Sequence, residues 1–191
     1  GSFLLAYRQT RMIIELGVNL MIQKIGKISS ANLEELRELC FSIMPLMQED
    51  HSNYAKGRKR IWLFHEVNLK TSHITEGYFN ERLWKLAQRF GCNIGLMSYG
   101  GKSLDSNGLI SFHRDHSYAM EQAITINLGS STFGYDLQRN GGDRQMFELK
   151  DGEIIQFNCK HLHSLVEIQS EIRFGINFWK LNTAKGFKPL I

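Results

Sequence analysis

The chain has 191 residues, of which 42% are hydrophobic and 22% are charged, so it can form a single globular domain with a sizeable core. This composition excludes a disordered chain, and no apolar run approaches the ~18 residues that span a membrane. The net charge of +4 permits a nucleic-acid partner without requiring one. Cys40, Cys92 and Cys159 lie far apart, which indicates a reducing, cytoplasmic setting.

The N-terminal part of the chain contains one clear helix after an ambiguous stretch. Residues 3–27 mix apolar and basic side chains, and their spacing fits strands as well as it fits a helix. Asn32 is the predicted N-cap of the helix that follows, because Glu35 stands three residues later in the spacing of a capping box. Apolar residues then recur at helical intervals, and Pro45 is expected to end the helix.

A polar stretch and a second helix complete the first half of the chain. Residues 48–60 are rich in charged side chains and predict a mobile loop, and the apolar residues 61–67 predict a strand. A helix is predicted over residues 81–90, with Asn80 as its N-cap and Gly91 immediately after its end.

From Gly91 onward the pattern changes to short strands separated by turn residues. The predicted strands are 93–99, 109–113, 122–128, 133–137, 145–149, 153–157, 164–168 and 172–179. This order predicts a mainly β protein with flanking helices (α+β), a double-stranded β-helix or jelly roll with the N-terminal helices packed on one face. We expect one domain over residues 1–191, with a helical and substrate-lid section at 1–90 and a catalytic core at 91–180.

Candidate metal ligands stand at the end of the predicted strand 109–113. His113 and Asp115 are two residues apart, so a strand presents their side chains on the same face. His161 and His163 also share a face and can each supply a second imidazole. Two histidines and one carboxylate hold Fe(II) and leave positions open for oxygen and a co-substrate. The simpler alternative is a surface ion pair between His113 and Asp115.

Arg173 is the candidate for binding an anion. It begins an otherwise apolar strand, where a guanidinium is costly unless an anion meets it. The planar fork of an arginine can bond both oxygens of a carboxylate. The alternative partner is a carboxylate of the chain itself, from Glu167, Glu171 or Asp151.

In these features the sequence resembles the AlkB-like branch of the Fe(II)/2-oxoglutarate-dependent dioxygenases. The matching elements are His113-Arg114-Asp115, residues 124–129, Phe133, residues 149–157, His163 and Arg173. The resemblance implies that His113, Asp115 and His163 bind Fe(II) and form the catalytic centre. His163 is preferred to His161 because it stands ten residues before Arg173, a familiar interval in the superfamily. His161 is then expected to be a solvated loop residue.

The resemblance also implies residues that bind the co-substrate 2-oxoglutarate. Arg173 would bind its distal carboxylate, and Tyr99 precedes the metal-binding strand as a co-substrate-binding tyrosine does in AlkB-like proteins. Met97 replaces the asparagine that accompanies this tyrosine in the family, and Tyr99 can equally be a core residue. Asn127 points the same way as Thr125, and either residue can line the cavity or both can satisfy neighbouring backbone groups.

The C-terminal signature of the nucleic-acid-repair members is only partly present. In that pattern, RxNxTxR, only the first arginine is matched, by Arg173. Gly175, Asn177 and Trp179 occupy the positions of the asparagine, the threonine and the second arginine. The resemblance therefore supports the iron and co-substrate sites more strongly than it supports repair.

The activity that the resemblance implies consumes 2-oxoglutarate and O2, releases succinate and CO2, and hydroxylates or oxidatively demethylates a substrate. One candidate substrate is a modified nucleobase, held by Tyr54, Arg58, Arg60 and Trp62, because basic and aromatic side chains bind phosphates and stack on bases. The alternatives are a small molecule such as an amino acid, a protein side chain, or no turnover at all in a jelly-roll domain that only binds ligands.

Overall fold

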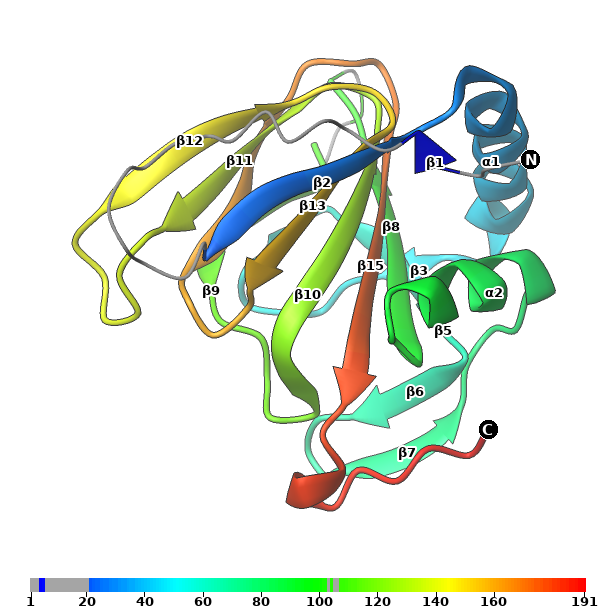
Figure 1. Ribbon diagram of the computed structural model, residues 1–191, viewed down its shortest axis with the longest axis vertical. Helices are drawn as coiled ribbons and strands as arrows, with labels where there is room; N and C mark the ends of the chain where they lie inside the picture. Colours follow the sequence, from blue (N-terminus) through cyan, green and yellow to red (C-terminus); the bar gives the residue numbers. More distant parts are fainter. Residues whose placement is uncertain (1–3, 6–20, 103, 105–106) are drawn as a thin grey trace.

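The structure, a computed structural model, describes residues 4–5, 21–102, 104 and 107–191. Two antiparallel sheets, of eight and five strands, face each other, and a two-stranded hairpin lies beside them (Figure 1). The mainly β jelly roll with flanking helices that the sequence predicts is confirmed. Of the ambiguous stretch 3–27, residues 22–27 belong to a strand, and residues 3 and 6–20 lie outside the described part.

The large sheet has the strand order β1-β2-β13-β10-β15-β8-β5-β3. Its strands are β1 (Leu4–Leu5), β2 (Ile22–Ile28), β3 (Gln48–Glu49), β5 (Lys59–Leu63), β8 (Ile94–Gly100), β10 (Ala119–Leu128), β13 (Glu153–Asn158) and β15 (Arg173–Leu181). The small sheet has the order β12-β11-β14-β9-β4. It consists of β4 (Ala55–Lys56), β9 (Leu109–His113), β11 (Ser131–Asp136), β12 (Arg144–Leu149) and β14 (His163–Ile168). The hairpin is β6 (His65–Asn68) with β7 (His73–Glu76).

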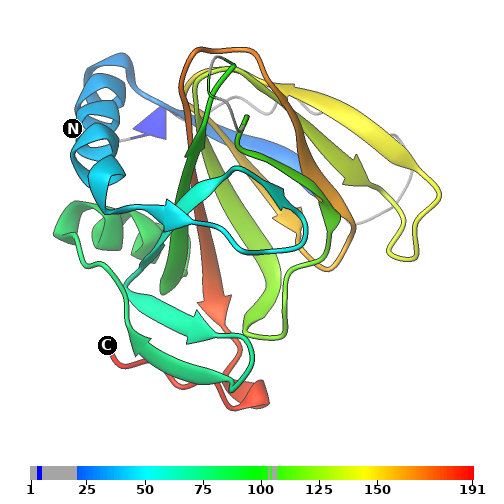
Figure 2. The same ribbon diagram turned by 180° about the vertical axis from the view of Figure 1, so that it is seen from behind.

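Both helices cover the outer face of the large sheet, as Figures 1 and 2 show from opposite sides. Helix α1 (Ser30–Ile43) and helix α2 (Glu81–Arg89) share one buried cluster with alternate residues of the sheet strands, among them Ile124, Ile176 and Phe178. The residues between them in sequence point the other way, into the space between the two sheets. Each of these strands thus packs apolar residues under the helices with one face and lines the space between the two sheets with the other.

The first helix begins three residues before the predicted position. Ser29, not Asn32, is its N-cap, and Asn32 instead donates from Nδ2 to Ser29 Oγ at 2.8 Å. Serine is also a favoured N-cap residue, and the helix begins directly after Ser29, the first of two consecutive serines. Pro45 lies in a short 3-10 helix, Met44–Leu46, directly after the α-helix. The second helix is confirmed: Asn80 Oδ1 accepts a hydrogen bond from Leu83 N at 3.0 Å.

The stretch predicted as a mobile loop, residues 48–60, instead contains β3, β4 and the start of β5. Its order is not visible in the sequence because it depends on one buried carboxylate: Asp50 forms ion pairs with both Arg58 and Arg60. The strand predicted over residues 61–67 is divided between β5 and β6 at Phe64, whose φ is 69°. Within the described ranges, no helix is both long enough and apolar enough to cross a membrane.

The two asparagines near the helix starts give a direct test of the capping assignment. Replacing Asn80→Ala removes an acceptor for a helix N–H, so the free energy of unfolding should fall by about 1 kcal/mol. Asn32→Ala removes only a side-chain contact to Ser29, so its effect should be smaller. Urea unfolding of the two variants measures both values. An equal or larger loss for Asn32→Ala would contradict the assignment of Ser29 as the cap.

Candidate metal centre and active site

A cavity of about 730 Å³ lies between the two sheets. Its inner wall is made by residues of β5, β8, β10 and β15 whose side chains face away from the helices, and its other wall by β9 and β14. A volume of this size suits a small molecule or a cofactor with a substrate beside it. The predicted metal ligands and the predicted anion-binding arginine all line this one cavity.

His113, Asp115 and His163 come together on its wall. His113 ends β9 and His163 begins β14, and the two residues are directly paired in the small sheet. The Nε2 atoms of His113 and His163 lie 3.4 and 3.3 Å from Asp115 Oδ1. One ligand atom from each of the three residues lies within 4.8 Å of the others, an arrangement that can hold a metal ion.

The other ring nitrogens orient the two imidazoles. His113 Nδ1 lies 2.8 Å from the carbonyl oxygen of Ser111, and His163 Nδ1 lies 2.9 Å from that of His161. A carbonyl can only accept, so each Nδ1 carries a proton, and Nε2 is the nitrogen that faces Asp115 and would bind a metal ion after losing its own proton. Metal-binding histidines are oriented in this way by a partner on the second nitrogen. The donor set therefore fits a divalent ion such as Fe(II).

Asp115 remains ionised although it is buried. Burial by itself would raise its pKa, but the charges and hydrogen bonds of His163 and His113 outweigh burial and hold the pKa well below its usual range. A further hydrogen bond supports the same carboxylate, since Trp179 Nε1 donates to Asp115 Oδ2 at 2.9 Å. A carboxylate that is ionised and fixed in place is a ready metal ligand.

His161 does not belong to the metal site. It is buried rather than solvated, which corrects the prediction for this residue. Its ring stacks on Tyr135 at a centroid distance of 5.6 Å, and its Nδ1 bonds the carbonyl oxygen of Asp136 at 2.9 Å. His163 is thus the histidine that the structure brings to His113. Sequence spacing could not separate the two because both face the same way.

Arg173 lies buried at the cavity wall without a carboxylate partner in the described part of the chain. Its Nε donates to Asn127 Oδ1 at 2.8 Å, and its guanidinium lies over Gly175, where a Cβ atom would be 2.6 Å from Nη1. Burial, with a smaller contribution from the charge of Arg58, lowers its pKa to about 9. The guanidinium is still charged at neutral pH, so an anion entering the cavity would meet an uncompensated positive charge.

Two predicted co-substrate residues do not line the cavity. Asn127 is fully buried, and its side chain bonds Arg173, Ser131 and nearby backbone carbonyls, so it positions the arginine instead. Tyr99 points to the helix side of the large sheet, where its ring lies 6.1 Å from that of Phe174. The reason is strand alternation: Ser98 lines the cavity, so the next residue faces the opposite side.

Thr125, the other residue named with Asn127 as able to line the cavity, lies on this wall, as do two polar residues that the motif did not identify, Ser98 and Asn177. Thr125 Oγ1 and Asn177 Oδ1 lie 2.6 Å apart, across the pairing of β10 with β15. The signal that could have found Asn177 is its position four residues after Arg173 on one strand face. Ser98 could be found only from the register of β8 against β15.

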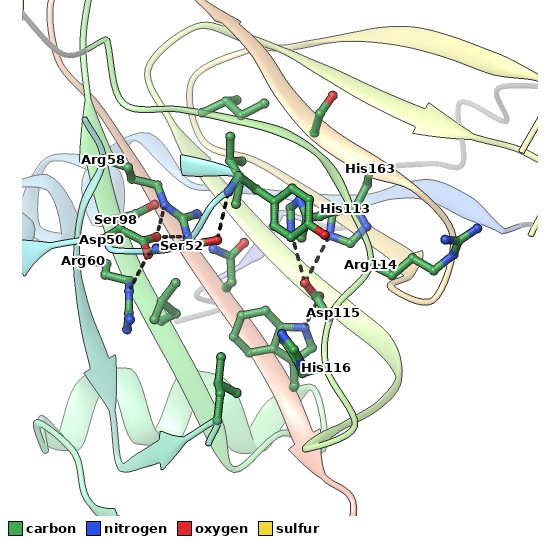
Figure 3. A pocket seen from close by; sticks show the side chains of 18 of the residues that line it. Asp50, Ser52, Arg58, Arg60, Ser98, His113, Arg114, Asp115, His116 and His163 are labelled. Atoms are coloured by element: carbon green, nitrogen blue, oxygen red, sulfur yellow. Dashed lines mark hydrogen bonds and ion pairs between the residues drawn. The ribbon is translucent and has the colours of Figure 1, made fainter. Parts of the chain in front are cut away.

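A charged cluster lies on the opposite side of the cavity from the metal ligands (Figure 3). The side chain of Asp50 is almost completely buried and binds Arg58 through Oδ2 at 2.5 Å and Arg60 through Oδ1 at 3.1 Å. Arg60 also lies over the ring of Trp62, 5.4 Å from its centroid. Tyr54 stacks on His113 at 5.6 Å, so all four predicted substrate-binding residues line the cavity.

No protein-family model and no curated protein matches this sequence. The three-dimensional structure, in contrast, matches solved structures. The structure of OsALKBH1 superposes with a TM-score of 0.66 at 10% identity, over 86% of this chain and 99% of that one. An oxidoreductase of the 2OG-Fe(II) oxygenase family from Burkholderia pseudomallei superposes with a TM-score of 0.62 at 14% identity, over 84% and 85% of the two chains. The chain therefore has the fold of the 2-oxoglutarate/Fe(II) oxygenases, as the AlkB-like motif predicted.

Proposed function

We propose that this protein is an Fe(II)- and 2-oxoglutarate-dependent dioxygenase that hydroxylates or oxidatively demethylates its substrate. One observation carries the proposal: a set of two histidines and one carboxylate shares a cavity with an arginine that has no carboxylate partner among the described residues. The fold likeness to 2-oxoglutarate/Fe(II) oxygenases supports it. A jelly-roll domain that only binds ligands would not require both features in one cavity.

Each part of the cavity has a role in this reaction. His113, Asp115 and His163 would hold Fe(II), and Arg173 would bind the distal carboxylate of 2-oxoglutarate. Bound iron supplies the oxidative decarboxylation of 2-oxoglutarate by O2 to succinate and CO2, coupled to hydroxylation of a substrate C–H. Phe157 and Phe133 pack on the ring of His163 at 4.9 and 6.1 Å and keep water from that side.

The charges around the cavity indicate what kind of substrate it accepts. Five cationic side chains line it, Arg58, Arg60, Lys70, Arg114 and Arg173, against two carboxylates, Asp50 and Asp115. Fe(II) and the dianion 2-oxoglutarate cancel each other's charge, so an excess of three positive charges remains. We propose that the substrate is a small molecule with an anionic group, placed against Arg60 and Trp62.

A modified nucleobase is the second candidate, because Trp62 and Tyr54 offer aromatic faces beside the arginines. The contacts of Asp50 make this candidate weaker. Arg58 and Arg60 share Asp50 inside the cavity wall, where the pair keeps one net positive charge for a small anion. Among the lysines and arginines of residues 48–60, only Lys56 and Lys59 are exposed. The basic residues of this stretch therefore form a poor binding surface for backbone phosphates, which contact basic side chains that are exposed and unpaired.

The first prediction tests the metal and co-substrate sites together. Anaerobic addition of Fe(II) to metal-free protein with 2-oxoglutarate should produce the visible iron-to-oxoacid charge-transfer band. His113→Ala should abolish the band because it removes a ligand, and Arg173→Ala should raise the 2-oxoglutarate concentration needed for it. Absorbance titration measures both effects. Absence of the band in the wild-type protein, with iron shown not to bind, would reject the proposed function.

The second prediction concerns Gly175. In Gly175→Ala the new methyl group must displace the guanidinium of Arg173. The Kd for 2-oxoglutarate should rise on the order of tenfold or more, because hydrogen bonds to charged groups contribute about 1.5–3 kcal/mol. Calorimetry with the Mn(II)-loaded protein measures it. The matched control is 2-oxobutyrate, which has no distal carboxylate and should bind both proteins equally. An unchanged Kd for 2-oxoglutarate would contradict the assignment of Arg173 as the residue that binds its distal carboxylate.

The third prediction separates the two substrate classes. A labelled single-stranded oligonucleotide should bind only weakly, with a Kd above about 10 μM at physiological salt, as non-specific contacts do. Replacing Lys56→Glu and Lys59→Glu together should leave substrate turnover unchanged, whereas Arg60→Gln should impair it. Fluorescence anisotropy and succinate release provide the two readouts. Submicromolar oligonucleotide binding that the lysine variant abolishes would favour the nucleobase.

A further inference from the structure

The indole of Trp179 forms a hydrogen bond with only one of the two carboxylate oxygens of Asp115. Its Nε1 donates to Asp115 Oδ2 at 2.9 Å, while Oδ1 faces the Nε2 atoms of His163 and His113 at 3.3 and 3.4 Å. One oxygen thus points to the place where three ligand atoms meet, and the other is held by a hydrogen bond from the opposite side.

We propose that Trp179 is a positioning residue that makes Asp115 a one-oxygen ligand and thereby keeps a coordination position open. A carboxylate can bind a metal through one oxygen or through both. An N–H bond to Oδ2 uses one lone pair of that oxygen and fixes the plane of the carboxylate, so that Oδ1 is the oxygen directed at the ion. The inference rests on the proposed metal site, not on the identity of the substrate.

The number of ligand positions shows why this matters. An octahedral ion that is held by two histidines and one carboxylate oxygen has three positions left. A 2-oxo acid takes two of them, and one remains for the second small reactant. If Asp115 bound through both oxygens, the 2-oxo acid could still bind but the last position would be lost. The hydrogen bond from Trp179 would thus decide whether the centre can react, not whether it can load.

The structure holds both partners of this hydrogen bond in place. Trp179 pairs with Ala123 on β10, whose small side chain leaves room for the indole, and its ring packs edge-on against Tyr118 at 5.8 Å and 86°. Asp115 donates its backbone N–H to the carbonyl oxygen of Cys159 at 3.0 Å. An indole N–H is neutral, so it restrains the carboxylate and leaves its negative charge for the metal.

Trp62 provides a matched comparison within the same cavity. Its ring also packs edge-on against Tyr118, at 5.5 Å and 81°, and it is about as buried as Trp179. It forms no hydrogen bond to Asp115. Trp179→Phe and Trp62→Phe therefore remove the same atoms from two rings that both pack on Tyr118, but only the first removes the bond to the metal ligand.

The experiment uses the full chain, loaded anaerobically with Fe(II) and 2-oxoglutarate, and nitric oxide as a probe of the last coordination position. Trp179→Phe should keep the charge-transfer band but bind nitric oxide about tenfold or more weakly, the usual size of effects from residues that orient metal ligands. Trp62→Phe, which is compared without substrate because Trp62 belongs to the proposed substrate-binding wall, should bind nitric oxide like the wild type. The spin-3/2 EPR signal of the iron–nitrosyl complex measures binding without any turnover.

The outcomes separate this inference from the proposed function. No charge-transfer band in the wild-type protein would reject the proposed function. A normal band with wild-type nitric oxide binding in Trp179→Phe would overturn the role of Trp179. Should that variant fail to fold, protein containing benzothienylalanine in place of tryptophan serves instead, because this analogue keeps the ring shape and has sulfur in place of N–H. Wild-type nitric oxide affinity in that protein would also overturn the role.

Discussion

The alternation of side chains along β15 is the constraint on which both the core and the cavity depend. Phe174, Ile176 and Phe178 pack under the helices, so the odd-numbered residues of the strand, among them Arg173, Asn177 and Trp179, must face the space between the sheets. A shift of one residue in the register of β15 would bury the arginine among the helices and expose the phenylalanines to the cavity. The large apolar face therefore fixes the positions of the polar groups, and stability and site geometry come from the same pairing.

The cavity has two arginine-containing sides that differ in charge compensation: one contains a carboxylate beside its arginines and the other does not. Asp50 neutralises one of two arginines on one wall, and that pairing gives a polar stretch enough order to form strands. Arg173 has an amide oxygen in place of a carboxylate, since Asn127 orients it without cancelling its charge. The ion pairs of Asp50 stabilise the cavity wall, whereas the hydrogen bond from Arg173 to Asn127 leaves a positive charge for a ligand. Residues of the same type thus have distinct functions because of what the chain places beside them.

The sequence was sufficient for the features that depend on local periodicity. The predicted strands from residue 93 onward, the second helix and the placement of His113 beside Asp115 follow from alternation and capping, and the structure contains them. Features that depend on pairing between distant strands could not be derived. His161 and His163 are equivalent until β14 is placed against β9, and Tyr99 or Ser98 can face the cavity until β8 is placed against β15. The hydrogen bond from Trp179 to Asp115 joins residues 64 positions apart and leaves no local signal.

The segment from β3 to β5 fastens the two sheets to each other. β3 and β5 belong to the large sheet, whereas β4, between them in sequence, pairs with β9 in the small sheet and carries the chain past His113. The separation of the walls at this end is therefore set by backbone hydrogen bonds and by the number of residues that connect these strands. Changing a side chain there alters what the wall recognises, but a wider ligand would require an insertion between β3 and β5. In a lineage of related proteins, a change of substrate size would accordingly be recorded as a difference in segment length.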